Sequence, residues 1–172
     1  MTMPNSNPTD KDEKQDKTIF FWIDILGFSD YLENDKEYKD LKRDLEEFRS
    51  LFDSSDMFKS FVISDGILIQ LNDYKQIETA VEKVAKQQKE FILKTKRFLR
   101  GGIAEGYILK EEDIKNKMII TDGLAKAVKI ESKNVSWPVI ATDEKNLKRI
   151  RGLLNNESSY FKLRKGFNES GG

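Results

Sequence analysis

TIFFWIDILGFS, residues 18–29, is the segment from which the architecture of this chain can be predicted. Residues Thr18 to Asp24 are apolar at nearly every position, which predicts a strand that is buried on both faces and central in its sheet. The strand ends on the acid Asp24. A helix is expected soon after it, because Ser29 or Asp30 can cap one. The sequence thus predicts a carboxylate held rigidly at the end of a central strand.

A second acid, Asp65, lies in FVISDGILIQ, residues 61–70. Two apolar runs joined by an Asp-Gly turn predict a β-hairpin with Asp65 at its tip. If a neighbouring strand ends beside that tip, two hard oxygen ligands converge where a magnesium-bound phosphate could bind. Taken alone, Asp65-Gly66 is also typical of a type I′ turn, and Asp24 of a helix cap or a strand end. Together they indicate a candidate metal site.

Apolar spacing predicts the remaining elements. Glycines at three positions of one predicted strand (Gly101, Gly102 and Gly106) indicate a close backbone approach. The elements are one or two helices over residues 29–52 broken near residues 34–35, a strand pair over 58–71, a helix over 76–95, strands over 98–109 and 118–121, a helix over 124–130, a strand over 137–142, a helix over 144–154 and an edge strand over 160–163.

Hairpins mixed with helical crossovers predict an α+β fold, a mostly antiparallel sheet with helices packed on one face. One domain is expected over residues 17–165. The polar segment over residues 1–16 is expected to be a disordered lead-in, and residues 166–172 a frayed end.

The composition excludes several kinds of chemistry. The chain has 172 residues, a formal net charge of zero, no cysteine and no histidine. Thiol catalysis, the usual zinc sites and a serine triad are therefore excluded. A neutral total argues against polymeric nucleic acid as a partner. No apolar run reaches the ~20 residues that span a bilayer, so no membrane partner and a cytoplasmic location are expected.

Four motifs in chain order resemble the class III nucleotidyl cyclase catalytic domain, over residues 19–143. They are a strand ending in Asp before a Gly-aromatic pair (Ile23 to Ser29), a hairpin bearing a second Asp (Ser64 to Gly66), a strand of the form Arg-x-Gly-Ile-x-x-Gly (Arg100 to Gly106), and a helix of Ala-x-x-Leu-Glu character (Ala127 to Glu131) before a Pro-bearing strand (Trp137 to Ile140). The last two strands look most similar to those of bacterial Pycsar-type cyclases, which make cyclic pyrimidine mononucleotides in anti-phage defence.

The resemblance implies a ferredoxin-like palm and a homodimer whose second subunit completes each active site. It implies that Asp24, Asp65 and the carbonyl of Ile25 hold Mg²⁺ or Mn²⁺. The ribose 3′-hydroxyl of a nucleoside triphosphate such as UTP or CTP then attacks the α-phosphate, and pyrophosphate leaves. The amides of three residues are implied to cradle phosphate ahead of the first helix: Leu26, Gly27 and Phe28.

Departures from the family pattern occur at the positions that orient the ribose, stabilise the transition state and read the base. Lys129 falls at the position of the transition-state arginine and Ala125 at that of the ribose-orienting asparagine. Phe61 and Met118 fall at the purine-reading positions, and neither reads a base edge by hydrogen bonds. Lys129 and Arg100 are the candidate catalytic residues, although lysine lacks the guanidinium fork. A solvated charge is the alternative for Lys129, and a sheet-end ion pair the alternative for Arg100.

Three functions therefore remain open. The first is a Mg²⁺- or Mn²⁺-dependent pyrimidine nucleotidyl cyclase. The second is a degenerate cyclase-like domain that binds a nucleotide or a partner. The third is a palm that makes oligonucleotides, as minimal CRISPR-related polymerases do. The residues that hold metal are intact in this sequence, whereas those that orient ribose and stabilise the transition state are altered.

Overall fold

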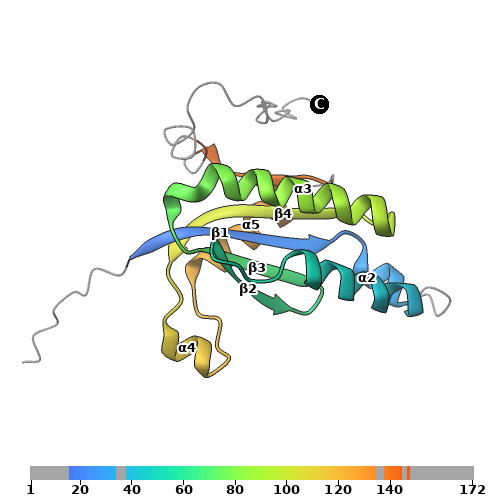
Figure 1. Cartoon of the computed structure of the whole chain (residues 1–172), viewed down its shortest axis with the longest axis horizontal. Coiled ribbons are helices and arrows are strands. Elements are labelled where there is room, and N and C mark those ends of the chain that lie inside the picture. Colours follow the sequence, from blue (N-terminus) through green and yellow to red (C-terminus); the bar gives the residue numbers. More distant parts are fainter. Residues whose placement is uncertain (1–15, 34–37, 135–137, 145–146, 148–172) are drawn as a thin grey trace, which may run out of the picture.

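A five-stranded sheet organises the computed structural model, which describes residues 16–33, 38–134, 138–144 and 147 (Figure 1). Its strands are β1 (Lys17–Ile25), β2 (Phe58–Ile63), β3 (Gly66–Leu71), β4 (Leu99–Tyr107) and β5 (Ile140–Thr142), in the spatial order β2-β3-β1-β4-β5. β1 pairs antiparallel with both β3 and β4, and only β5 runs parallel to its neighbour. The predicted central strand and mostly antiparallel sheet are confirmed.

Helices connect the strands. They are α1 (Phe28–Leu32), α2 (Tyr38–Leu51), α3 (Ile77–Thr95) after the short 3₁₀ turn η1 (Tyr74–Gln76), α4 (Glu111–Lys115) and α5 (Asp122–Asn134). All but α4 follow the apolar spacing; α4 lies in the charged segment over residues 110–117, where a loop was expected. α1 and α2 join β1 to β2, and α3 joins β3 to β4. Among the described residues, no helix combines the length and apolarity needed to cross a bilayer.

The sheet is covered on both faces, so the prediction that helices pack on one face was wrong. Alternate residues of β1 point to opposite sides. Phe21 and Ile23 pack with Phe48 of α2 and Phe91 of α3. Phe20 lies on the other side, where α5 packs against β4 and β1 (Figure 1). The apolar spacing of α5 did reveal a buried face, but not which side of the sheet it would cover.

Glycines let α5 lie against the backbone of β4, as the strand glycines predicted. A Cβ at Gly102 would lie 2.0 Å from the carbonyl oxygen of Ala127, and one at Gly106 would lie 2.3 Å from the Cα of Gly123. No side chain fits in either gap. The two glycines therefore fix the distance between α5 and the sheet.

Two local predictions were wrong. Residues 118–121 form no strand; they are irregular chain between α4 and α5, although Ile119 and Ile120 are β-formers. The hairpin turns on Ser64 and Asp65, with Gly66 already in β3, instead of on Asp65-Gly66. The predicted helix over residues 144–154 falls largely, and the strand over residues 160–163 entirely, outside the described residues, as do residues 1–15 and 166–172.

Candidate functional site

Asp24 and Asp65 come together at one end of the sheet. Asp24 is the last residue of β1 that pairs with β3, directly opposite Gly66. Because β1 and β3 are antiparallel, the turn that precedes Gly66 lies beside the end of β1, and the side chain of Asp65 is within hydrogen-bonding reach of Asp24. Ser64, the first turn residue, has a left-handed φ of 57°, which places Asp65 second in the turn. The sequence identified this pair correctly as neighbours.

The carboxyl of Asp24 is protonated far more readily than an ordinary aspartate. Burial is the main cause, and the charge of Asp65 and its hydrogen bond to Asp24 act in the same direction, raising the pKa of Asp24 to about 7. The guanidinium of Arg100 opposes the shift and lowers the pKa only in part. Two acids held this close without a full counter-charge resemble a site that takes up a cation.

Arg100 lies opposite Asp24 in β4 and joins it to a second buried acid. Its Nε and Nη2 donate to Asp24 Oδ2 over 3.4 and 3.3 Å. Its Nε also lies 2.5 Å from Oε1 of Glu131, which is on α5 and only 4 % exposed. The sequence alternative of a sheet-end ion pair thus describes Arg100 in this structure. Glu131 is part of the predicted helix motif, but its role as a partner of Arg100 was missed. Nothing in the sequence pairs an acid on a helix with an arginine on a strand 31 positions earlier.

Trp22 covers the same face of the sheet next to the acids. Its ring occupies the space over Gly66, where a Cβ would lie 2.1 Å from the indole. The requirement for glycine after Asp65 is therefore steric, because Gly66 itself has no left-handed φ. Trp22 belongs to the strand that was predicted to be buried on both faces, and it packs against two of the core clusters on this face.

One of the three amides predicted to bind phosphate already has a hydrogen-bond partner. The amide of Leu26 donates to the carbonyl of Phe98 over 2.9 Å, so it is committed to extending the β1–β4 pairing. Gly27 has a left-handed φ of 75° and turns the chain into α1, which begins at Phe28. The two later amides, of Gly27 and Phe28, remain the candidates for contact with phosphate.

The residues predicted to read the base and to stabilise the transition state lie on three different segments of the chain. Phe61 is half-buried and packs against the cluster formed by Phe20, Leu68 and Leu109. Met118 is 42 % exposed in the segment before α5. Lys129 is exposed on α5.

A divalent cation fits the donor set at Asp24 and Asp65. Mg²⁺ and Mn²⁺ prefer oxygen ligands, and Mg²⁺ is commonly held by one or two carboxylates plus substrate phosphates. Burial raises the pKa of Asp24 most, and a cation would relieve the repulsion from Asp65 that adds to it. In the part of the chain that the structure describes, no group of three or more His, Cys, Asp or Glu side chains is arranged for a metal ion. A cation at this pair would need further oxygen ligands besides the two carboxylates.

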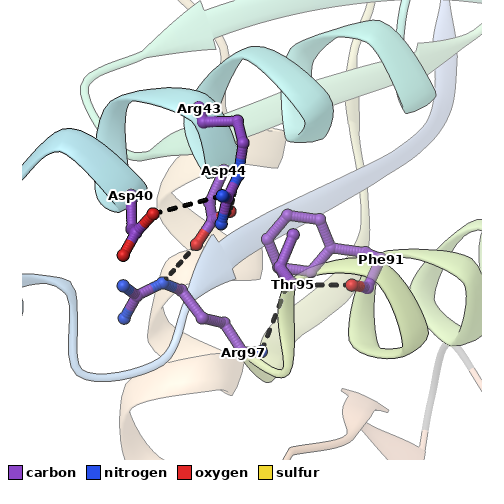
Figure 2. A network of polar contacts seen from close by, with 6 residues as sticks. All are labelled: Asp40, Arg43, Asp44, Phe91, Thr95 and Arg97. Carbon is purple, nitrogen blue, oxygen red and sulfur yellow. Dashed lines mark hydrogen bonds and ion pairs between the residues drawn. The ribbon is translucent and has the colours of Figure 1, made fainter. Parts of the chain in front are cut away.

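A buried ion pair fixes the chain beside the site (Figure 2). Arg97 Nε donates to Asp44 Oδ2 over 2.7 Å, and Asp44 is 2 % exposed within α2. The guanidinium also lies 3.8 Å from the ring centre of Tyr31 in α1. The Arg97 amide is held by Thr95 Oγ1 at the end of α3. Sequence reasoning missed this network, because charged residues on amphipathic helices are normally solvated.

A pocket formed by described residues lies away from the carboxylate pair. It has a volume of about 400 Å³ and is open to solvent, lined by Tyr107, Ile119, Ile120, Thr121 and Asp122. It lies at the opposite end of β1 and β4, where Lys17 pairs with Tyr107. Its polar groups bind one another: Asp122 accepts from the Tyr107 amide and Thr121 donates to the Tyr107 carbonyl. We base the candidate site on the carboxylate pair and not on this pocket.

Comparison with known proteins adds no relative. No protein-family model, no curated protein and no solved structure matches this chain. The carboxylate pair, the strand order and the residues around them are therefore the features that bear on function.

Proposed function

We propose that this chain binds a nucleoside triphosphate together with Mg²⁺ or Mn²⁺ and converts it to a 3′,5′-cyclic nucleotide, plausibly a pyrimidine one that signals in anti-phage defence. The observation that carries the proposal is the carboxylate pair at the end of β1. Asp24 and Asp65 come from a central strand and from a hairpin tip, two rigid elements, and each faces the other. Rigid placement of charged ligands is what catalysis by bound cations requires.

The strand order supports this proposal. The elements β1, α2, β2, β3, α3 and β4 run in the order β-α-β-β-α-β, and the four strands lie in the order β2-β3-β1-β4. This is the split βαβ arrangement of ferredoxin-like folds. The palm of nucleotidyl cyclases has that arrangement, and the acids lie on β1 and on the β2–β3 hairpin as the resemblance implies. Fold alone does not give function, so the argument depends on the acids.

Each of the site residues has a separate part in the proposed reaction. A divalent cation bound here neutralises charge on the triphosphate and on the oxygens that attack and leave. Asp24 and Asp65, with the Ile25 carbonyl, hold the cation. Asp24 must be ionised to do so, which its pKa of about 7 makes dependent on pH. The amides of Gly27 and Phe28, in the turn after β1, would contact the phosphates.

A second copy of the chain completes the proposed site. Ala125 and Lys129, which occupy the positions that orient ribose and stabilise the transition state in the resemblance, are exposed on α5. Exposure leaves them accessible to a nucleotide bound at another subunit. Lys129 would supply positive charge to the α-phosphate as a single point of contact, without a guanidinium fork.

The purified chain, incubated separately with ATP, GTP, CTP and UTP and with Mn²⁺, tests the proposal. We expect a cyclic mononucleotide and pyrophosphate from at least one triphosphate, identified by mass. Asp24→Asn and Asp65→Asn should each abolish product, and Asp56→Asn, an exposed acid away from the sheet end, should not. Oligonucleotides in place of a mononucleotide would identify a polymerase-like palm. Absence of any product and of pyrophosphate with all four triphosphates would refute cyclase activity.

A second candidate function is nucleotide binding without turnover. Two observations favour it: Ala125 offers no amide to orient ribose, and Arg100 is already committed to Asp24 and Glu131. In that case a triphosphate with Mn²⁺ should raise the melting temperature while no product forms. Stabilisation that persists in the Asp24→Ala and Asp65→Ala variants would place nucleotide binding away from the carboxylate pair.

A further inference from the structure

Arg100 lies directly on Asp24, one of the proposed metal ligands. Its guanidinium lies between two carboxylates that differ in surroundings. The contacts to Asp24 are long, at 3.3 and 3.4 Å, and the Asp24 side chain is partly accessible at the end of the sheet. The contact to Glu131 is 2.5 Å, and that side chain is 5 % exposed. The arginine is thus held more closely by the acid on α5 than by the acid in the site.

Glu131 has unmet capacity for hydrogen bonding. Although its Oε1 lies close to Arg100 Nε, no donor among the described residues reaches that buried oxygen with hydrogen-bond alignment. A buried carboxylate oxygen without an aligned donor is costly. If the guanidinium turned from Asp24 toward Glu131, it could satisfy this oxygen with a forked pair of bonds. Arg100 is about one-third exposed, so the turn has room.

We infer that Arg100 is an internal counter-cation of the carboxylate pair, which leaves Asp24 for Glu131 when a divalent cation binds. This inference rests on the proposed metal site. Arg100 and the metal compete for the same oxygens of Asp24. Glu131 weakens the competition from Arg100, because it binds the guanidinium when the guanidinium leaves Asp24. Glu131 is therefore a positioning residue for the site, acting through Arg100 without touching the cation.

The inference predicts opposite effects from the two partners. Arg100→Gln removes the competitor and should tighten Mn²⁺ binding by about three- to tenfold. Glu131→Gln removes the second anchor, leaves Arg100 to Asp24 alone, and should weaken Mn²⁺ binding by a similar factor. A purely structural ion pair predicts something different, because loss of either partner would loosen the same contact between β4 and α5 and shift the affinity in one direction.

The experiment measures free Mn²⁺ by electron paramagnetic resonance during titration of the full chain. Two control variants carry the same changes of charge on exposed positions: Lys133→Gln, on α5 two residues past Glu131, and Glu46→Gln on α2. Both should stay within about twofold of the parent, because exposed charges are screened by solvent and salt. Circular dichroism establishes that each variant is folded.

Arg100→Lys supplies a second variant if the glutamine variants do not fold. Lysine keeps the charge but cannot fork between two acids, so the Arg100→Lys variant should bind Mn²⁺ more tightly than the parent, by less than the three- to tenfold expected for Arg100→Gln. Equal affinity in all Arg100 variants, or shifts of the same sign for Arg100→Gln and Glu131→Gln, would overturn the inference and leave the metal site standing. No Mn²⁺ binding by the parent or by Arg100→Gln would overturn both proposals.

Discussion

Asp65→Asn should make the metal-free protein more stable at pH 8, although it removes a proposed functional residue. The reason is the charge on Asp24. An aspartate in the unfolded chain has a pKa near 3.8, whereas burial and Asp65 raise that of folded Asp24 to about 7. Folding therefore takes up a proton between these values. The free energy of unfolding falls as the pH rises from about 4 to 7, and is constant above that range.

The size of the gain follows from the shift. A difference of about 3 pKa units corresponds to at most about 4 kcal/mol of lost stability above pH 7. Burial is the largest cause, so the part due to Asp65 is smaller, about 1 kcal/mol once access to solvent is allowed for. Asparagine keeps the shape of the turn residue and can still accept a hydrogen bond, but carries no charge. At pH 4.5, where Asp24 is largely protonated in the folded state, no gain is expected.

Urea unfolding followed by circular dichroism at pH 4.5 and pH 8, in EDTA, measures the effect. Asp56→Asn, the same chemical change at an exposed position, serves as the matched control and should change stability by less than about 0.5 kcal/mol at either pH. The reasoning would be refuted if Asp65→Asn gave no gain at pH 8, so that the free energy of unfolding changed equally at both pH values. It would mean that the two carboxylates do not repel each other in the folded chain.

Three further outcomes are expected. Gly102→Ala should destabilise the protein by about 2 kcal/mol or more in urea unfolding, because its Cβ would meet the Ala127 carbonyl at 2.0 Å; an unchanged midpoint would contradict the close packing of α5. Asp44→Asn should cost about 3 kcal/mol by the same measurement, since it removes the buried carboxylate that accepts from Arg97, and a loss below about 1 kcal/mol would show that this ion pair contributes little to stability. Mn²⁺ at pH 8 should raise the melting temperature of the parent and not of Asp24→Asn; equal shifts in both would place the metal elsewhere.

Much of the fold could be predicted from the sequence because its strands have a strong apolar pattern. The two-sided burial of β1 and the hairpin of β2 and β3 are local properties of short segments, and both acids lie at their ends. The closeness of the two acids could be predicted because the chain order favours antiparallel pairing of the strands beside them. The position of α5 could not be predicted, since its apolar stripe fits either face of a sheet.

The details of the site were less predictable. Gly66 suggested a turn at Asp65-Gly66, but the ring of Trp22 above the strand explains this glycine, and Ser64 takes the left-handed φ instead. The partners of Arg100 and Arg97 are acids far away in the sequence, and ion pairs between distant charged residues carry no local pattern. In a chain with 35 % charged residues, many such pairs are possible. Only three-dimensional packing selects one of them.

The contact of Arg97 with Tyr31 has a consequence for motion near the proposed site. α1 has five residues, too few for a helix to persist without tertiary contacts. The ring of Tyr31 on the guanidinium, itself held by Asp44, is one such contact. The amides of Asp30 and Tyr31 both donate to the carbonyl of Gly27, in the turn after the carboxylate strand. Their hydrogen-exchange rates therefore report local opening of that turn, and release of Arg97 should quicken exchange there while the centre of β1 stays protected.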